Sequence, residues 1–281
     1  MILGGYMEEV VKKLKSMAAQ LRIDTINAVH HAKSGHPGGS LSAADIIAAL
    51  YFYKMRVNPA EPDWDDRDRF VLSKGHAAPI LYAALARRGF FYIDELYKLR
   101  HVSSFLQGAP SLNTPGIDMT AGPLGQGLSA AVGISLAGKY KKKNYNTFVI
   151  IGDGEMQEGQ IWEAAMAAAK FKLSRLVCFL DHNKIQMCGR IDDIMPVDCA
   201  RDKMSAFGWE VKEINGHNMI EIVSLLDSLD TRTDQRPLFV VAHTVKGKGV
   251  SYMEDTFAWH GGVPNDEQYA IALKELEESK K

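Results

Sequence analysis

The feature that most constrains the fold is a strand–helix–strand unit in the middle of the chain. Residues 146–154 read NTFVIIGDG, residues 159–172 read GQIWEAAMAAAKFK, and residues 175–183 read RLVCFLDHN. The two outer segments contain the uninterrupted apolar runs FVII and LVCFL, which are typical of strands buried on both faces of a parallel sheet, and the segment between them suits a crossover helix. The sequence therefore predicts a βαβ unit.

The rest of the chain continues this alternation of strands and helices. We expect a helix over residues 8–31, a second over 41–55 capped by Ser40 or Ser42, a strand, turn and helix over 70–89, a glycine-rich loop leading into a helix over 122–141, a helix over 220–229, a strand over 237–245 and a charged last helix over 266–281. The pattern predicts an α/β fold with a mainly parallel sheet flanked by helices. Without an internal repeat or a long linker, residues 1–281 are expected to form a single domain.

Composition and charge argue against some classes of function, including nucleic-acid binding. The chain is 46% hydrophobic and has a formal net charge of −1, so it can form a packed core but lacks the basic excess typical of nucleic-acid-binding proteins. Cys178, Cys188 and Cys199 lack metal-ligand spacing, and we expect them to be reduced and mostly packed. No apolar run approaches the about 20 residues that cross a bilayer, and the first residues do not read as a signal peptide. We therefore expect a cytoplasmic protein with no nucleic-acid or membrane partner.

Two polar side chains follow the neighbouring strands of the βαβ unit. Asp153 ends the first strand within Gly152-Asp153-Gly154, and Asn183 follows the second. Together with a backbone carbonyl near Ile185, they supply oxygen ligands of the kind that Mg²⁺ takes when it bridges a diphosphate. The flanking glycines allow the backbone to approach the phosphates. GDG alone would suit an ordinary βα turn, but the asparagine after the next strand favours a metal site.

This arrangement resembles that of thiamine-diphosphate enzymes, and four further segments resemble motifs of the transketolase family. They are residues 34–38 (SGHPG), residues 72–83 (LSKGHAAPILYA), residues 122–127 (GPLGQG) and residues 259–261 (WHG). The motifs stand in the family's order and cover residues from about 10 to 275. The resemblance implies the thiamine-diphosphate-binding fold, here the diphosphate-binding domain.

The resemblance also implies roles for individual residues. Thiamine diphosphate and Mg²⁺, or Ca²⁺ or Mn²⁺ in its place, are the expected cofactors. Asp153, Asn183 and the carbonyl of Ile185 would bind the metal, and His36, His76 and His260 would be catalytic. The residues expected to contact the cofactor are His76, Gly122, Pro123, Leu124, Gly154, Glu158, Asn183, Lys246 and His260.

Histidines suit this chemistry, because a neutral imidazole can donate or accept a hydrogen bond and titrates near physiological pH. Glu158 and Glu163 resemble carboxylates near the subunit interface of the family, although a solvated helix face would also explain them. The remaining histidines, which match no motif, are expected to be structural, with His217 in a turn or cap: His30, His31, His101, His182, His217 and His243.

Two departures from the family pattern limit the interpretation. In transketolases a second domain, which a third domain follows, carries both the glutamate that activates the cofactor and the pocket that binds its pyrimidine. No segment of this sequence is left to supply them. We expect a partner chain, the C-terminal transketolase subunit, in an α2β2 heterotetramer. In addition, Ala109 stands where family members usually have a histidine that helps to bind the donor sugar.

The expected reaction is transfer of a two-carbon ketol unit from a ketose phosphate to an aldose phosphate. The enzymatic alternatives are the α-subunit of a 2-oxo acid dehydrogenase, against which SGHPG and GPLGQG argue, and a deoxyxylulose-phosphate synthase, which normally keeps three domains on one chain. A non-catalytic relative that retains the fold is a further alternative. The intact Asp153 and Asn183 argue against it, whereas Ala109 mildly favours it.

Overall fold

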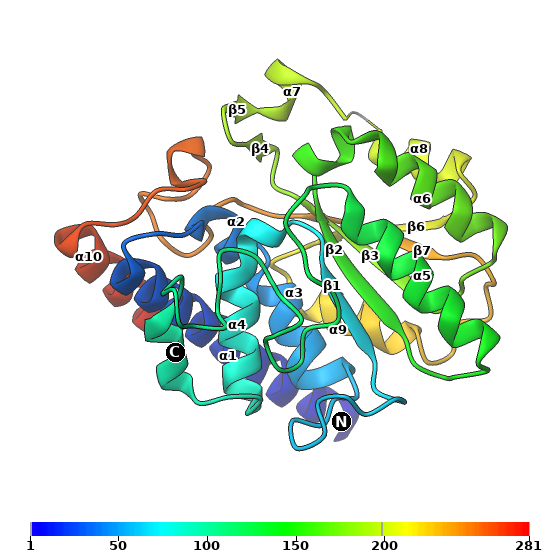
Figure 1. Ribbon diagram of the computed structural model, residues 1–281, viewed down its shortest axis with the longest axis horizontal. Helices are drawn as coiled ribbons and strands as arrows, with labels where there is room; N and C mark the ends of the chain where they lie inside the picture. The colour runs from blue at the N-terminus through cyan, green and yellow to red at the C-terminus, as the bar shows by residue number, and fades with distance from the viewer. Residues whose placement is uncertain (1, 198, 281) are drawn as a thin grey trace.

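A parallel sheet forms the centre of the molecule. The computed structural model describes residues 2–197 and 199–280 and contains a five-stranded sheet in the order β1-β2-β3-β7-β6, with every neighbouring pair parallel (Figure 1). The strands are β1 (Arg69–Leu72), β2 (Thr147–Gly152), β3 (Leu176–His182), β6 (Glu210–Asn215) and β7 (Leu238–His243), and a separate antiparallel pair consists of β4 (Ile185–Gln186) and β5 (Gly189–Arg190). The predicted α/β fold with a mainly parallel sheet is confirmed.

Helices cover both faces of this sheet (Figure 1). One layer contains α1 (Ile2–Ala32), α2 (Pro37–Ser42), α3 (Ala44–Ala49), α4 (Ala78–Arg88) and α9 (Met219–Ser228), and the other contains α5 (Gln126–Tyr140), α6 (Gly159–Lys170) and α8 (Ala200–Ala206). The short α7 (Ile191–Ile194) lies beyond the sheet, and α10 (Asp266–Glu278) packs against α1. A π-helical turn (Leu50–Lys54) and 3₁₀ turns at Gly75–Ala77, Ile93–Lys98, Gly154–Gln157 and Phe257–Trp259 complete the described elements.

The central strands are buried on both faces, as their uninterrupted apolar sequences predict. Successive strand residues point to opposite sides of the sheet. Phe148 and Ile150 of β2 belong to the core that contains α1, α3, α4 and α9, whereas Val149 and Ile151 pack with α5, α6 and α8. The β2–α6–β3 segment is therefore the predicted crossover unit, with β2 and β3 directly paired.

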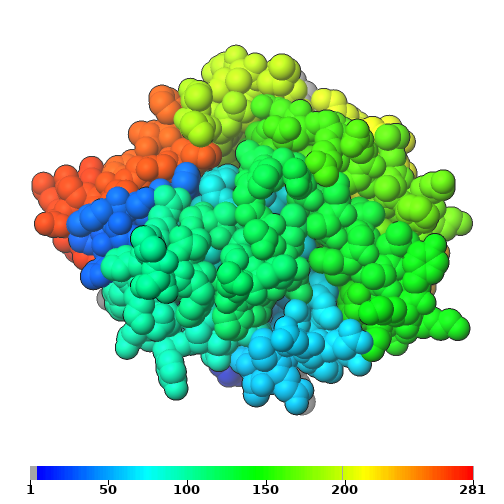
Figure 2. All heavy atoms as spheres, in the orientation of Figure 1, coloured from blue at the N-terminus to red at the C-terminus, as the bar shows by residue number. Residues whose placement is uncertain are grey.

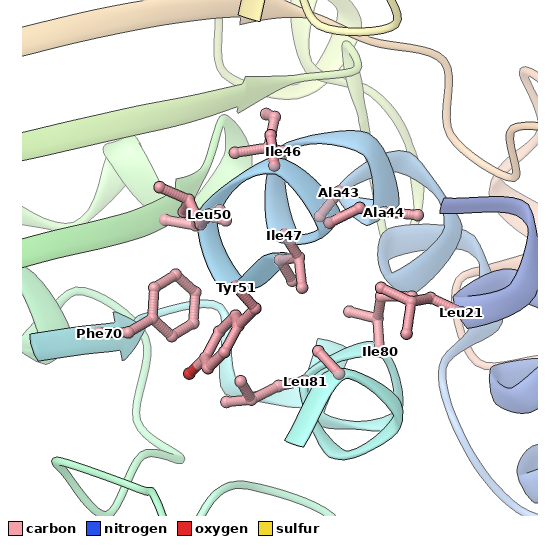
Figure 3. Close-up of a cluster of buried hydrophobic side chains, with 14 of the residues drawn as sticks. Leu21, Ala43, Ala44, Ile46, Ile47, Leu50, Tyr51, Phe70, Ile80 and Leu81 are labelled. Carbon is pink, nitrogen blue, oxygen red and sulfur yellow. The ribbon is translucent and has the colours of Figure 1, made fainter. Parts of the chain in front are cut away.

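Figure 3 shows part of the core between α3 and α4. Ile47 and Tyr51 point toward Ile80 and Leu81 of α4, and the ring of Tyr51 meets that of Phe70 edge to face at a centroid distance of 5.5 Å. Such a pair stabilises by about 0.5–1.5 kcal/mol beyond the area it buries. This packing fixes β1, and with it the segment that leads to His76.

The prediction that Ser40 or Ser42 caps the second helix was wrong. Helix α2 begins at Pro37, one turn earlier, because proline favours the first helical turn, where its missing N–H leaves no partner unsatisfied. Both serines therefore lie inside α2. The Ser40 hydroxyl donates to the carbonyl of His36 at 2.8 Å, and the Ser42 hydroxyl points into the interior, where it donates to Asp181.

The cysteines are free among the described residues, as expected, but the prediction that they are mostly packed was wrong. Cys178 is buried in β3, whereas Cys188 and Cys199 are exposed because they lie in the segment between β3 and β6, outside the sheet. Figure 2 shows this segment (yellow-green) projecting at the surface above the green helices. No helix within residues 2–197 and 199–280 is long and apolar enough to cross a membrane.

Candidate active site

A cavity of about 400 Å³ opens beyond the carboxyl ends of β2 and β3, where ligands bind in sheets of this kind. Its walls come from seven separate stretches of the chain, which include the recognised motif segments but not the segment of Ala109. The lining residues that the sequence predicted are His36, His76, Gly122, Leu124, Asp153, Gly154, Glu158, Asn183, Ile185, Lys246 and His260. Pro123 is exposed beside Gly122 and does not line the cavity, so a contact with the cofactor stays a prediction for it.

The candidate metal ligands lie side by side. Gly152 pairs with Asp181 in the register of β2 and β3, so Asp153 and Asn183 emerge together just past the ends of adjacent strands. Both side chains are buried. The carboxylate of Asp153 accepts hydrogen bonds from the amides of Gly154, at 2.8 Å, and Lys184. Amide donors therefore hold the carboxylate in place, while its remaining lone pairs are free to bind a cation.

The Asp153 carboxylate stands in an environment that a bound cation would stabilise. Burial, and then the neighbouring Asp181 carboxylate, raise the pKa of Asp153 to about 7, and a bound cation would lower it again. The ammonium of Lys246 donates to the carbonyl of Ile185 at 2.8 Å, so a cation bound to this third candidate ligand would have to replace the lysine there. Among the described residues, no cluster of three His, Cys, Asp or Glu side chains could hold a metal ion. The candidate set instead offers a carboxylate, an amide and a carbonyl, which suits Mg²⁺ completed by phosphate and water.

The three predicted catalytic histidines form one cluster. The ring centroids of His76 and His260 lie 4.8 Å apart, and His36 lies 5.3 Å from His76 and 5.6 Å from His260. Burial is the main cause that lowers the pKa of all three, and the charge of Lys246 adds to it, bringing the pKa of His260 to about 3. All three imidazoles are therefore neutral at pH 7.

Two cations orient these rings. Lys246 contacts Nδ1 of His260 at 2.7 Å, and the guanidinium of Arg100 contacts Nδ1 of His36 at 3.5 Å. Because a guanidinium and an ammonium can only donate, each Nδ1 accepts, and the ring proton is assigned to Nε2. Both histidines can therefore donate from Nε2 to an oxygen of a bound molecule.

The GPLGQG loop approaches the cavity through a left-handed turn. Gly125 has φ of +86°, and a Cβ there would lie 2.7 Å from the Cβ of Glu158. Only glycine suits both the conformation and the close contact. The buried carboxylate of Glu155 joins this loop to the end of β2, because it accepts hydrogen bonds from the amides of Gly125, at 2.8 Å, and Gly152, at 3.0 Å.

Sequence reasoning missed three buried charged residues at this site. Lys74 and Glu155 line the cavity, and Asp181 lies beneath it and binds Lys74. Although burial alone would raise the pKa of Asp181, the ammonium of Lys74 lowers it overall. Lys74 lies within the segment 72–83, Glu155 follows Gly154, and Asp181 precedes Asn183 by two residues. This nearness in the sequence was the only available signal.

The remaining predicted residues lie at or outside the rim. Glu158 and Glu163 are both exposed, at the start and within the first turns of α6. Ala109 does not line the cavity, and its carbonyl accepts from the hydroxyl of Tyr82 at 2.9 Å. None of the six histidines expected to be structural lines the cavity. His217 lies in a turn, as predicted, and Asn218 caps the following helix, α9.

Comparison with known proteins agrees with this geometry. Residues 13–277 match the family model described as "Transketolase, thiamine diphosphate binding domain". The chain belongs to the transketolase family. Its described fold also aligns with transketolase from Campylobacter jejuni at a TM-score of 0.89 and 31% identity, covering 94% of this chain and 42% of that one.

Some transketolase relatives match over nearly their whole length. One of the subunits of apulose-4-phosphate transketolase from Phocaeicola vulgatus is 43% identical, with 95% of each chain covered. The SqwG subunit of 6-deoxy-6-sulfo-D-fructose transketolase from Clostridium sp. is 44% identical, with 96% of this chain and 98% of the relative covered. Human transketolase is 40% identical over 90% of this chain, but only 40% of the human protein is covered. This chain thus matches the thiamine-diphosphate-binding subunit of two-chain transketolases.

Proposed function

We propose that this chain binds thiamine diphosphate and Mg²⁺ as one subunit of a transketolase that transfers a two-carbon ketol unit from a ketose phosphate to an aldose phosphate. The observation that carries the proposal is that Asp153 and Asn183 share one cavity with His36, His76 and His260. A metal site for a diphosphate and a cluster of neutral imidazoles for sugar hydroxyls are the two sets of groups that this reaction requires of the chain.

In this proposal the cavity floor binds the cofactor. Asp153, Asn183 and the carbonyl of Ile185 hold Mg²⁺, and the buried ammonium of Lys246 stabilises the diphosphate. Gly122, Pro123, Leu124, Gly154, Glu158, His76 and His260 form the surrounding contacts. When bound, thiamine diphosphate supplies the nucleophilic carbon that permits carbon–carbon cleavage.

The histidine cluster then acts on the sugar. His36 and His260 present Nε2–H groups, which donate to a carbonyl or hydroxyl oxygen of the substrate. Since the pKa of each ring is lowered, a proton that a ring takes up is readily released again, which suits proton movement between substrate oxygens.

We infer that a partner chain completes the enzyme. Two relatives matched end to end are named as subunits, and human transketolase extends well beyond the matched region. The proposed partner is a C-terminal transketolase subunit that supplies the activating glutamate, assembled with this chain as a cytoplasmic α2β2 heterotetramer. Residues 1–281 are proposed to form a single cofactor-binding domain.

The identity of the sugar is a separate question. The two subunit relatives are about equally similar to this chain, yet their names give different substrates, apulose 4-phosphate and 6-deoxy-6-sulfo-D-fructose. We propose that Ala109 alters donor preference, since a methyl group cannot donate to the donor hydroxyl that a histidine would bind. The Ala109→His variant should then favour donors that carry this hydroxyl, as measured by kcat/KM for paired donors.

Calorimetric titration of thiamine diphosphate with Mg²⁺ tests the proposal, first on this chain alone and then on a mixture with the proposed C-terminal transketolase subunit. Binding in the mixture, with ketol transfer from xylulose 5-phosphate to ribose 5-phosphate, is the expected result. Asp153→Ala should abolish Mg²⁺-dependent binding, whereas Asp63→Ala, which changes an exposed carboxylate before β1, should leave it intact.

Each other outcome has a distinct meaning. Unchanged binding by Asp153→Ala would refute the metal assignment. Binding without turnover would retain the cofactor and point to a different sugar. Absence of binding in both settings would favour the non-catalytic alternative.

A further inference from the structure

The strongest feature that the proposed function leaves unexplained is a fully buried carboxylate beneath the cavity. Asp181, at the end of β3, has no exposed surface. One oxygen, Oδ2, accepts from the Ser42 hydroxyl at 2.6 Å, from the Asn183 side-chain amide at 3.0 Å and from the ammonium of Lys74. The other oxygen, Oδ1, accepts from the hydroxyl of Thr244. Four donors on one carboxylate make an environment in which only an acceptor is tolerated.

This environment decides which way the Asn183 side chain faces. An asparagine amide has a donor side, NH₂, and an acceptor side, the oxygen, of nearly equal size. Because the carboxylate of Asp181 can only accept, the NH₂ of Asn183 is held against it. The oxygen then faces the other way, where it also accepts from the amide of Ile185 at 3.1 Å. Only this orientation presents an oxygen, rather than two hydrogens, to a cation.

The same carboxylate joins the segments that carry the histidines. Ser42 ends helix α2, which begins directly after His36, and Lys74 precedes His76 by two residues. Lys74 also donates to the carbonyl of Gly39 at 2.6 Å and so links these two segments to each other. A change at Asp181 therefore reaches the metal ligand Asn183 directly, and it reaches the segments that carry His36 and His76 through Ser42 and Lys74.

We propose that Asp181 is a positioning residue that selects the oxygen-outward orientation of the Asn183 amide and thereby sets the affinity of the site for its divalent cation. This inference rests on the proposed function, since it concerns the same metal site. Partners of this kind behind a metal ligand typically change metal affinity by about 10–100-fold when they are removed. The effect expected for Asp181→Asn lies in that range, because the new amide can pair with either side of Asn183.

The decisive experiment exchanges the two side chains. Mn²⁺ is titrated into the full chain mixed with its partner, in the presence of thiamine diphosphate, and free Mn²⁺ is followed by electron paramagnetic resonance. Asp181→Asn should weaken binding by about 10–100-fold. The Asp181→Asn/Asn183→Asp double variant should recover most of the loss, because a carboxylate at position 183 presents oxygen on both sides and the amide at position 181 can donate to it. Failure of the double variant to recover would overturn the proposal.

A matched control separates positioning from general stability. Asp118 is also a buried carboxylate, but it lies at the opposite end of β1, where it accepts from Arg67 at 2.6 Å and from the amide of Phe70 at 2.8 Å. Asp118→Asn should lower the melting temperature while leaving Mn²⁺ affinity unchanged. Equal loss of affinity in Asp118→Asn and Asp181→Asn would mean that Asp181 acts only through stability.

A measurement on the unaltered chain keeps the proposal testable if Asp181→Asn fails to fold. The signal of the Asn183 side-chain amide can be identified because it is missing from Asn183→Asp. The hydrogens of this amide should exchange slowly with solvent, because they face a buried carboxylate. Fast exchange would contradict the proposed orientation. If the unaltered mixture binds neither Mn²⁺ nor thiamine diphosphate, the proposed function itself fails, whereas normal binding that Asp181→Asn does not weaken refutes only this inference.

Discussion

Replacing Gly127 by alanine should destabilise the chain, although alanine normally favours helices. Gly127 lies in the first turn of α5, where an added Cβ would stand 2.6 Å from the Cα of Ser73. A contact with a backbone atom cannot be relieved by rotating a side chain, so α5 must move away from the end of β1. Overpacking of this kind costs about 1–3 kcal/mol. Alanine regains about 1 kcal/mol of helix propensity, which leaves a net loss of up to about 2 kcal/mol.

The same helix offers a matched control. Gly133 is exposed, and a Cβ there would meet nothing within 4 Å, so Gly133→Ala should stabilise the chain by about 0.5–1 kcal/mol. Urea denaturation of the cofactor-free chain, followed by circular dichroism, should therefore move the two midpoints in opposite directions. A midpoint for Gly127→Ala at or above that of the unaltered chain would refute the packing argument.

Three other predictions follow from charges and caps. Asp45→Asn should cost about 3–5 kcal/mol, measured by urea denaturation at pH 7, because it leaves the buried guanidinium of Arg22 without its partner; a cost below about 1 kcal/mol would contradict this. The fold lowers the pKa of His260 from 6.5 to about 3, so between these pH values only the unfolded chain binds a proton at this residue. The free energy of unfolding of the unaltered chain therefore decreases as pH falls below about 6.5. Because His260→Asn has no such proton to bind, the difference in free energy of unfolding between the variant and the unaltered chain should shift in favour of the variant from pH 7 to pH 5. A difference that stays constant would refute the lowered pKa of His260. Asn265→Ala removes a capping box from α10 and should cost about 1 kcal/mol in thermal unfolding, and an unchanged melting temperature would contradict this.

The sequence predicted the central strands well because their apolar runs are uninterrupted. Strand β6 (Glu210–Asn215) was not predicted, because charged residues interrupt its apolar positions. It lies at the edge of the sheet, where most of its side chains reach solvent, and its sequence therefore lacks the apolar run that marked β2 and β3.

The candidate site was predictable where motifs carry it and unpredictable where its support is a buried charge. His36, His76 and His260 were found because each stands in a recognised motif. Glu155 and Asp181 were missed because charged residues are ordinarily exposed, and only tertiary structure brings them their donors. A sequence shows the charge of such a residue but not the partners that allow it to be buried.

The cavity is lined by segments that run from His36 to His260, so its lining comes from nearly the whole length of the chain. Such a site exists only when almost the whole fold is in place. A ligand that binds it is therefore linked to global folding and should stabilise the native chain by about 2.7 kcal/mol at about 100 times its Kd. Destabilising substitutions far from the cavity should then appear as weakened cofactor binding at low cofactor concentration, and saturating cofactor should rescue them.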